Sequence, residues 1–316
     1  MIDDEPVILA GELQRHVLDQ ARRAGELERL RRGAYRSVEK PRDEHRLQTA
    51  RRRARALAAA AHRQLDADHV FSHETAALLH GLRLWRVPAV THVVQAYRRS
   101  GGAAADLARH LGTVPSAHRV DQDGLPVTTL ARTVADCARS MHPLEGLVIA
   151  DHALARGVDL DECRAALGVT RRRNGTRRAR WVLDHADAGA DSTWETWLRY
   201  VALRCGLPQP ITQAPITTAR GVFHCDLGWP DWSVYAEFDG LVKYRDGGVR
   251  PGHHAAQELL REKERFDAIR ATGINPVRVT AVGSSRLGEV TRALTARFPE
   301  ELRRTLRQHP LLPPPP

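Results

Sequence analysis

The chain has 316 residues, of which 42% are hydrophobic and 27% are charged, and its formal net charge is +10. These proportions are ordinary for a globular protein long enough for two or three domains, and they exclude a disordered or fibrous chain. The basic excess favours a polyanionic partner, most simply nucleic acid, although an arginine-rich surface without such a partner has the same composition.

Nothing in the sequence indicates a membrane. No apolar run approaches the roughly 20 residues of a spanning helix, and Met1 to Glu5 lack the basic and apolar regions of a signal peptide. The four cysteines are scattered without C-x-x-C spacing, which favours neither a disulfide framework nor a zinc site. We therefore expect a protein of the reducing cytoplasm, with no membrane partner.

The N-terminal segment predicts a helix followed by a basic hairpin. Residues 7–24 show helical spacing of apolar positions, and residues 26–38 contain two extended stretches joined at Gly33. A helix followed by a hairpin with an Arg-Arg-Gly tip resembles the wing of a winged helix, whose arginines contact phosphates or a minor groove. An ordinary exposed hairpin is the alternative. The candidate DNA-binding residues here are Arg29, Arg31, Arg32 and Tyr35.

Residues 42–65 predict a long helix whose run of arginines, Arg51 to Arg55, is typical of a solvated face. Ser72 is then an expected N-cap of a short helix that ends at Gly81. The histidines of this region have no carboxylate or cysteine partner at ligand spacing, so we expect surface or packing roles for His62, His69, His73 and His80.

Short strands are expected around residues 90–94, 114 and 120, and helices over 130–138 and 144–168. A linker with six arginines in ten residues follows at 171–180. Such arginine density is either a solvated linker or a track for phosphates, with Arg172, Arg173, Arg177 and Arg178 as the candidates.

A new domain is expected to begin at Ser192, where Ser192 and Glu195 have the capping-box spacing. Its helix continues to Gly206. A strand at 213–217, a hairpin at 222–239, a helix at 255–272, a strand at 274–279 and a last helix at about 286–297 follow. We expect the proline tail, 313–316, to be disordered.

The hairpin at 222–239 carries the candidate site. If Pro230 and Asp231 form a two-residue turn, Trp229 faces Trp232 and Asp226 faces Tyr235. Alternation then places Asp226, Glu237 and Asp239 on one face, opposite an apolar face that includes Cys225. Carboxylates so close, with Asp226 and Glu237 roughly 7 Å apart at Cβ, repel unless a cation lies between them or one holds a proton. This pattern predicts a Mg²⁺ site, or Mn²⁺ in its place.

The C-terminal part, about residues 190–285, resembles the PD-(D/E)xK nuclease fold, in the branch related to very-short-patch repair endonucleases. The stretches that carry the resemblance are 192–199, 206–208, Asp226, 237–240, Lys243-Tyr244, 262–265, Gly273 and 277–279.

This resemblance implies that Asp226 and Glu237 bind Mg²⁺ and that Glu195 helps position a metal-bound water. The sequence departs from the family where a lysine is expected, because Asp239 occupies that position. Asp239 is therefore a third candidate ligand, and the missing cation is expected from Lys243, Lys263 or Arg265, which complete the catalytic and DNA-binding candidates.

The first half resembles the N-terminal part of abortive-infection type IV antitoxin family proteins. The residues that carry this resemblance are 30–35, 72–77 and 130–136. It implies a winged-helix DNA-binding segment followed by an α/β domain, and it leaves open a toxin partner.

Together these patterns predict an α+β protein with a winged-helix-like segment (1–40), an antitoxin-like α/β domain (41–170), an arginine-rich linker and helix (171–190), a restriction-endonuclease-like mixed sheet flanked by helices (191–300) and a proline-rich tail (301–316). The expected function is metal-dependent DNA cleavage with an N-terminal DNA-binding module. The alternative is a non-enzymatic antitoxin or transcriptional autoregulator with a degenerate nuclease fold.

Overall fold

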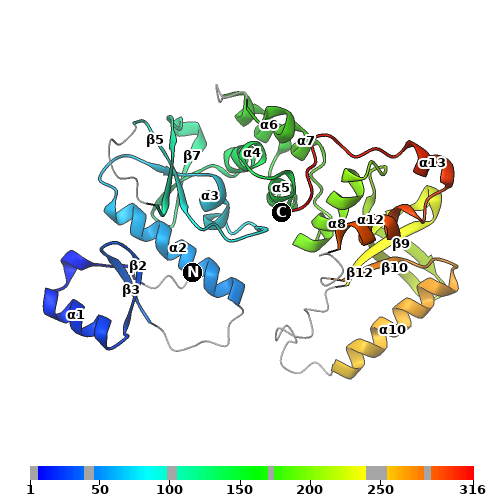
Figure 1. Ribbon diagram of the computed structural model, residues 1–316, viewed down its shortest axis with the longest axis horizontal. Helices are drawn as coiled ribbons and strands as arrows, with labels where there is room; N and C mark the ends of the chain where they lie inside the picture. Colours follow the sequence, from blue (N-terminus) through cyan, green and yellow to red (C-terminus); the bar gives the residue numbers. More distant parts are fainter. Residues whose placement is uncertain (1–5, 39–45, 98–104, 170–173, 240–254, 281–285) are drawn as a thin grey trace. The chain divides into compact units, whose positions relative to one another are not determined.

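The computed structural model describes residues 6–38, 46–97, 105–169, 174–239, 255–280 and 286–316, with backbone alone for 255–259 (Figure 1). Helices and three sheets, one antiparallel and two mixed, make up this part of the chain, which confirms the predicted α+β class. Lys243, Arg172 and Arg173 lie outside the described residues. Within the described ranges, no helix combines the length and the apolar composition that crossing a bilayer requires.

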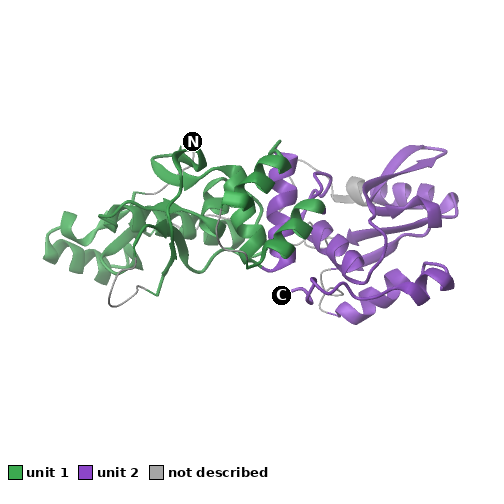
Figure 2. Cartoon of the chain, turned by 90° about the horizontal axis from the view of Figure 1, so that it is seen from above, with its two compact units in different colours: residues 1–141, 157–184 green, residues 142–156, 185–316 purple. Residues whose placement is uncertain are grey.

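The chain forms two compact units (Figure 2). Unit 1 comprises residues 1–141 and 157–184, and unit 2 comprises 142–156 and 185–316. This division differs from the boundary expected at 171–190. Helix α7 (Thr176–Asp184) packs against α4 (Leu130–Ser140) and so belongs to unit 1, whereas α5 (Pro143–Ala155) packs against α8 (Thr193–Arg204) and belongs to unit 2.

Unit 1 begins with a small three-stranded sheet and one exposed helix. The elements are β1 (Ile8–Leu9), the short helix η1 (Ala10–Glu12), α1 (Arg15–Arg23), β2 (Leu27–Arg31) and β3 (Ala34–Ser37). The predicted hairpin is confirmed, and Gly33 takes a positive φ of 76° at its turn. The predicted helix over 7–24 is wrong in its first half, because Ile8 and Leu9 pair with β3.

Helix α2 (Arg46–Gln64) is buried against two sheets because its second half is an alanine run. Ala60 packs with Val7 and Leu30 of the small sheet. Ala58 and Ala61 pack with the cluster around Phe71. Methyl side chains let the helix approach both sheets closely, so this stretch links the N-terminal segment to the rest of unit 1.

The arginines of α2 do not form a simple solvated face. Arg53 bonds Glu28 of β2 at 2.8 Å. Arg51 and Arg55 donate to the carbonyls of Leu82 and Leu78, at 2.7 and 3.1 Å. The carbonyls at the end of a helix lack intrahelical donors, so Arg55 helps to satisfy the end of α3 (His73–Leu79), and Arg51 bonds the segment that follows it.

The second sheet of unit 1 has the order β6-β5-β4-β8-β7 and mixes parallel and antiparallel pairs. Its strands are β4 (Val70–Phe71), β5 (Thr91–Gln95), β6 (Leu107–Leu111), β7 (Arg119–Gln122) and β8 (Leu125–Thr128). The short helix η2 (Ser116–His118) precedes β7, and α6 (Leu160–Val169) packs on α4 and α7.

Unit 2 is built on the sheet β12-β11-β10-β9. Helix α10 (Ala255–Ala271) lies on one face of this sheet, and α8 and α12 (Leu287–Thr295) lie on the other (Figure 1). The strands are β9 (Ile211–Thr218), β10 (Gly221–Trp229), β11 (Val234–Asp239) and β12 (Val277–Thr280). β11 and β12 are parallel, and the other pairs are antiparallel, which gives the predicted mixed sheet.

A buried ion pair joins α5 to α8. Arg199 is fully buried and its Nη2 lies 2.5 Å from Oδ2 of Asp151, which is 2% exposed. Asp151 also accepts hydrogen bonds from the Asp187 amide and from the Thr196 hydroxyl, at 2.9 and 2.7 Å. Burial raises the pKa of Asp151, and the Arg199 guanidinium and these donors oppose that rise.

The proline tail is ordered against α8, so the expectation of a disordered end is wrong. Tyr200 donates to the carbonyl of Pro313 at 2.7 Å, and Arg204 donates to that of Leu312 at 3.1 Å. Leu312 is 3% exposed. The chain reaches this position through α13 (Glu300–Thr305), and Gly206 permits the approach because a Cβ there would meet the Arg307 carbonyl at 2.4 Å.

We expect Asp151→Ala to lower the free energy of unfolding by about 3–5 kcal/mol, because it leaves the Arg199 charge buried without a counter-ion. Urea denaturation of the full chain measures this. Asp161→Ala is the matched control, since Asp161 is 86% exposed and its pair with Arg164 should contribute no more than about 1 kcal/mol. Equal losses in the two variants would contradict the assignment.

Candidate functional site

The hairpin of β10 and β11 has a different register from the predicted one. Leu227 pairs with Ala236, and Trp229 pairs with Val234 rather than with Trp232. The connection is longer than two residues because Pro230–Trp232 form the short helix η3 and Ser233 takes a positive φ of 51°. The register therefore moves by two residues, which leaves the parity of facing residues unchanged at the tip.

Strict alternation fails beyond the paired tip. Cys225 packs in one cluster with Tyr235 and with Ile269 of α10, although the sequence placed these two hairpin residues on opposite faces. Burial raises the pKa of the Cys225 thiol, and the charge of Glu237 and a hydrogen bond with it add to this rise. Cys225 and Glu237 are therefore also neighbours. At Asp226 the strands are joined through a side chain, because the Phe238 amide of β11 donates to Asp226 Oδ2 at 2.7 Å.

Of the three predicted ligands Asp226, Glu237 and Asp239, Asp226 is the one that forms no ion pair among the described residues. Burial raises the pKa of Asp226 to about 7; the hydrogen bond from Phe238 opposes the rise, and the charges of Glu195 and Glu237 add to it. Its raised pKa follows from partial burial beside two other acids. A carboxylate in this setting takes up either a proton or a cation.

Glu237 and Asp239 each have a guanidinium partner. Glu237 is 6% exposed and pairs with Arg265 of α10, which also donates to the His224 carbonyl at 2.8 Å. Asp239 pairs with Arg278 of β12 at 2.6 Å. Arg265 was among the predicted cations. Arg278 was not, although it alternates with two valines in a strand that proves to be parallel to β11.

Glu195 lies at the start of α8, and Ser192 caps that helix as predicted, accepting from the Glu195 amide at 3.2 Å. The Glu195 carboxylate does not complete the capping box. Its Oε2 accepts from the Asp191 amide at 2.8 Å and from Gln213 of β9 at 3.1 Å. Glu195 thus ties α8 to the sheet while its charge acts on Asp226.

Asp226 and Glu237 are the predicted ligands with an oxygen left for a divalent cation, whereas the Asp239 carboxylate is turned to an arginine. Asp226 is a half-buried acid that forms no ion pair within the described ranges, although the charge of Arg265 acts on it. Glu237 accepts one guanidinium, and a carboxylate of that kind still has a second oxygen for a metal. Two carboxylates with water are a common Mg²⁺ donor set. Asp239 instead faces Arg278, and in the described part of the chain the three predicted ligands do not bring their oxygens within 4.8 Å of one another.

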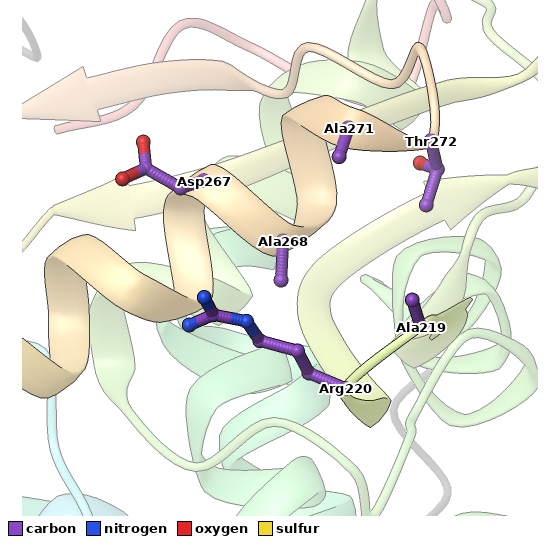
Figure 3. Close-up of a pocket in the computed structure, with 6 residues that line it drawn as sticks. All are labelled: Ala219, Arg220, Asp267, Ala268, Ala271 and Thr272. Atoms are coloured by element: carbon purple, nitrogen blue, oxygen red, sulfur yellow. The ribbon is translucent and has the colours of Figure 1, made fainter.

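A pocket of about 230 Å³ in unit 2 lies away from these acids, between the β9–β10 turn and the end of α10. Figure 3 shows its lining, in which Arg220 extends beneath α10 and the Asp267 carboxylate points away from it. The rest of the lining is alanine and threonine, so the pocket offers little for recognition of a ligand.

The basic candidates fall into two groups. Exposed side chains are Arg29, Arg32, Arg177 and Lys263. Two others bond within the protein: Arg31 pairs with Asp106 at 2.9 Å, and Arg178 donates to the Met141 carbonyl at 2.8 Å. Tyr35 is 7% exposed and packs under the Arg22 guanidinium, so it supports the hairpin from inside and is not a surface contact.

Helix α1 is a basic surface that the sequence did not single out. Leu18 is its buried residue, and its exposed side chains include Arg15, His16, Arg22 and Arg23. The sequence shows these basic residues spaced around one apolar position, Leu18. The surface was missed because the helix was expected to be longer, over residues 7–24.

Comparisons with known proteins give short or distant matches. The chain is 30% identical over 152 residues to two proteins of Mycobacterium tuberculosis, uncharacterized protein MT2308 (strain CDC 1551 / Oshkosh) and uncharacterized protein Rv2248 (strain ATCC 25618 / H37Rv). The match covers 48% of this chain and 53% of each relative, so the chain spans about half the length of the curated relatives it matches.

Among solved structures, the RV2827C protein from Mycobacterium tuberculosis is similar at 16% identity, over 58% of this chain and 72% of that one, with a TM-score of 0.39. A likeness this low supports no inference. No family profile matches the chain.

The raised pKa of Asp226 predicts a pH-dependent stability. An unfolded aspartate titrates near about 3.9, whereas folded Asp226 titrates at about 7. Between these values the folded protein binds the extra proton, so this group makes stability fall as the pH rises towards 7. The variant Asp226→Asn lacks this titration. In EDTA, its free energy of unfolding minus that of wild type should therefore be greater at pH 8 than at pH 5. The expected change is up to about 2.5 kcal/mol, because each pH unit between the two pKa values contributes about 1.4 kcal/mol.

Urea denaturation at the two pH values measures this difference, and Asp231→Asn controls for loss of a carboxylate on the same hairpin. A relative stability of Asp226→Asn that is the same at both pH values would contradict the shifted pKa.

Proposed function

We propose that this protein is a metal-dependent DNA endonuclease with an N-terminal DNA-binding module. The observation that carries the proposal is Asp226, a half-buried carboxylate without an ion pair in the described structure, held beside Glu237 and within the field of Glu195. Clustered acids with a perturbed pKa are typical of functional sites. The arrangement lies on a mixed sheet between helices α8 and α10, as the nuclease resemblance implies.

In this proposal Asp226 and Glu237 hold Mg²⁺ or Mn²⁺. Such a cation, when bound, lowers the pKa of a water and stabilises charge on the scissile phosphate. Arg265 fixes the Glu237 carboxylate from α10, and Glu195 fixes the start of α8. Two lysines were candidates for a phosphate contact. Lys263 is exposed on α10, and Lys243 lies outside the described residues.

DNA binding is proposed for the surface of α1 and the β2–β3 hairpin. Arg15 and Arg23 are exposed on α1, and Arg29 and Arg32 are exposed on the hairpin. A helix beside a basic β-ribbon offers both a groove-sized element and phosphate contacts. The four free, buried cysteines accord with the cytoplasm as the compartment, where thiols stay reduced.

A second candidate function is DNA binding without cleavage, as in a transcriptional autoregulator or antitoxin with a toxin partner. Its supporting observation is that two of the three acids predicted as metal ligands, Glu237 and Asp239, are each paired with an arginine and so already have a cation. The DNA-binding surface of α1 and the hairpin serves either function.

Nicking of supercoiled plasmid tests the cleavage proposal. We expect wild-type protein to relax the plasmid in Mg²⁺ or Mn²⁺, and Asp226→Asn or Glu237→Gln to lose at least about 100-fold in rate, since each removes a charge that holds the cation. Asp231→Asn should cleave as wild type does. Folded wild-type protein that cleaves no duplex, nicked or mismatched DNA with either metal would exclude the endonuclease and leave the regulator.

DNA binding is tested apart from cleavage, in EDTA, by fluorescence anisotropy over a salt series. We expect Arg29→Ala with Arg32→Ala to weaken binding and to reduce the slope of log affinity against log salt by about 2, because about one phosphate contact is lost with each arginine. The control doublet is Arg297→Ala with Arg303→Ala, exposed arginines of unit 2. An unchanged slope in the hairpin doublet would contradict the assignment.

A further inference from the structure

Three histidines that are far apart in the sequence converge in unit 1. His73 begins α3, His92 lies on β5 and His110 lies on β6. One ring nitrogen from each lies within 4.8 Å of the others. The sequence predicted a surface or packing role for His73, because no carboxylate or cysteine partner lies at ligand spacing. Its two histidine partners come from strands that pair only in the folded sheet.

The backbone fixes the positions of these residues. β5 and β6 run parallel with His92 opposite Ala108 and Val94 opposite His110, so His92 and His110 point to one face of the sheet. The start of α3 is joined to His92 by two bonds: the Ser72 amide donates to the His92 carbonyl at 3.1 Å, and the His92 amide donates to Thr75 Oγ1 at 2.8 Å. This connection brings His73 over the two strand histidines.

Ring contacts also join the three histidines. Nδ1 of His92 lies 3.0 Å from Nε2 of His110. Nδ1 of His73 bonds Ser72 Oγ at 2.9 Å, so Nε2 is the His73 nitrogen for a metal. The His73 ring stacks on His110 with centroids 3.8 Å and planes 13° apart, so one of these two rings must turn for both to bind a single ion. The outer nitrogen of His92, Nε2, lies 3.3 Å from Oε2 of Glu74.

We propose that His73, His92 and His110 bind a zinc ion, with Ser72 and Glu74 as the outer hydrogen-bond partners of the ligand rings. Three imidazoles supply three of the four ligands of tetrahedral Zn²⁺. Metal-bound histidines characteristically donate their second ring N–H to a carboxylate or another acceptor, which is the relation of Glu74 to His92 and of Ser72 to His73.

Two further features accord with this site. His73 is not a glycine, yet it has a φ of +52°, and such strained residues concentrate at ligand-binding positions. Burial lowers the pKa of both His73 and His92, which favours the neutral imidazole that coordinates a metal. The side chains of His92 and Glu74 are 15% and 24% exposed, so the cluster is not sealed from solvent.

The test uses untagged full-length protein, stripped with EDTA and then titrated with zinc against a chromophoric chelator, with bound zinc counted by elemental analysis after gel filtration. We expect one zinc per chain. His92→Gln and His110→Gln should weaken binding by more than about 100-fold, and Glu74→Gln by about 10–100-fold, the usual effect of losing an outer partner.

His62→Gln is the matched control, because His62 Nδ1 and His69 Nε2 also lie 3.0 Å apart in unit 1 but form no such group of three in the described structure. His62→Gln should bind zinc as wild type does. Failure of plasmid nicking would not affect this result, so the two proposals are separable.

Cobalt substitution of the wild-type protein provides a readout that does not depend on the folding of any variant. A four-coordinate spectrum without thiolate charge-transfer absorption is expected from imidazole ligands. The proposal is overturned if folded wild-type protein retains no zinc, if folded His110→Gln binds zinc as tightly as wild type, or if the cobalt spectrum shows thiolate ligands.

Discussion

The buried pair of Asp151 and Arg199 is the interaction on which the geometry of unit 2 depends. Both charges are removed from water and make further bonds within the same small region. Arg199 donates to the His185 carbonyl at 2.5 Å, although its buried Nε has no acceptor among the described residues, and Asp151 accepts from Asp187 and Thr196. The pair therefore fixes α5, α8 and the segment between His185 and Asp187 as one element. It also explains why α5 groups with unit 2 and not with its neighbours in the sequence.

That element positions the acidic site. Asp187 continues the network to β9 through Thr212 Oγ1 at 2.8 Å, and Glu195 joins α8 to Gln213 on the same strand. On the other face of the sheet, Arg265 of α10 holds Glu237. Asp226, between these fixed groups, accepts a hydrogen bond from a backbone amide, and the charges of two acids and of Arg265 act on it. A fold that holds an ionisable group in this way favours uptake of a cation or a proton, and this links the structure to the proposed chemistry.

Much of this arrangement could be predicted from local sequence. The Ser192 cap, the basic hairpin around Gly33 and the strands carrying Asp226 and Glu237 all follow from short-range signals and were confirmed. The register of the acidic hairpin could not be predicted in the same way, because η3 and the left-handed Ser233 lengthen a turn that two residues would have closed. The cations of Asp239 and Glu237 come from β12 and α10, and only one of them was predicted, since a parallel strand pairing is not visible in the spacing of the chain.

The histidine cluster was missed for the same reason, as its members meet through the pairing of β5 with β6 and the bond between Ser72 and His92. The two units would then bind different metals, with imidazole donors in unit 1 and carboxylate donors in unit 2. Anomalous diffraction from crystals grown with Mn²⁺ tests the central claim most directly. We predict a manganese ion bound by Asp226 and Glu237, and crystals in which manganese is absent from these carboxylates while Glu237 remains paired with Arg265 would contradict it.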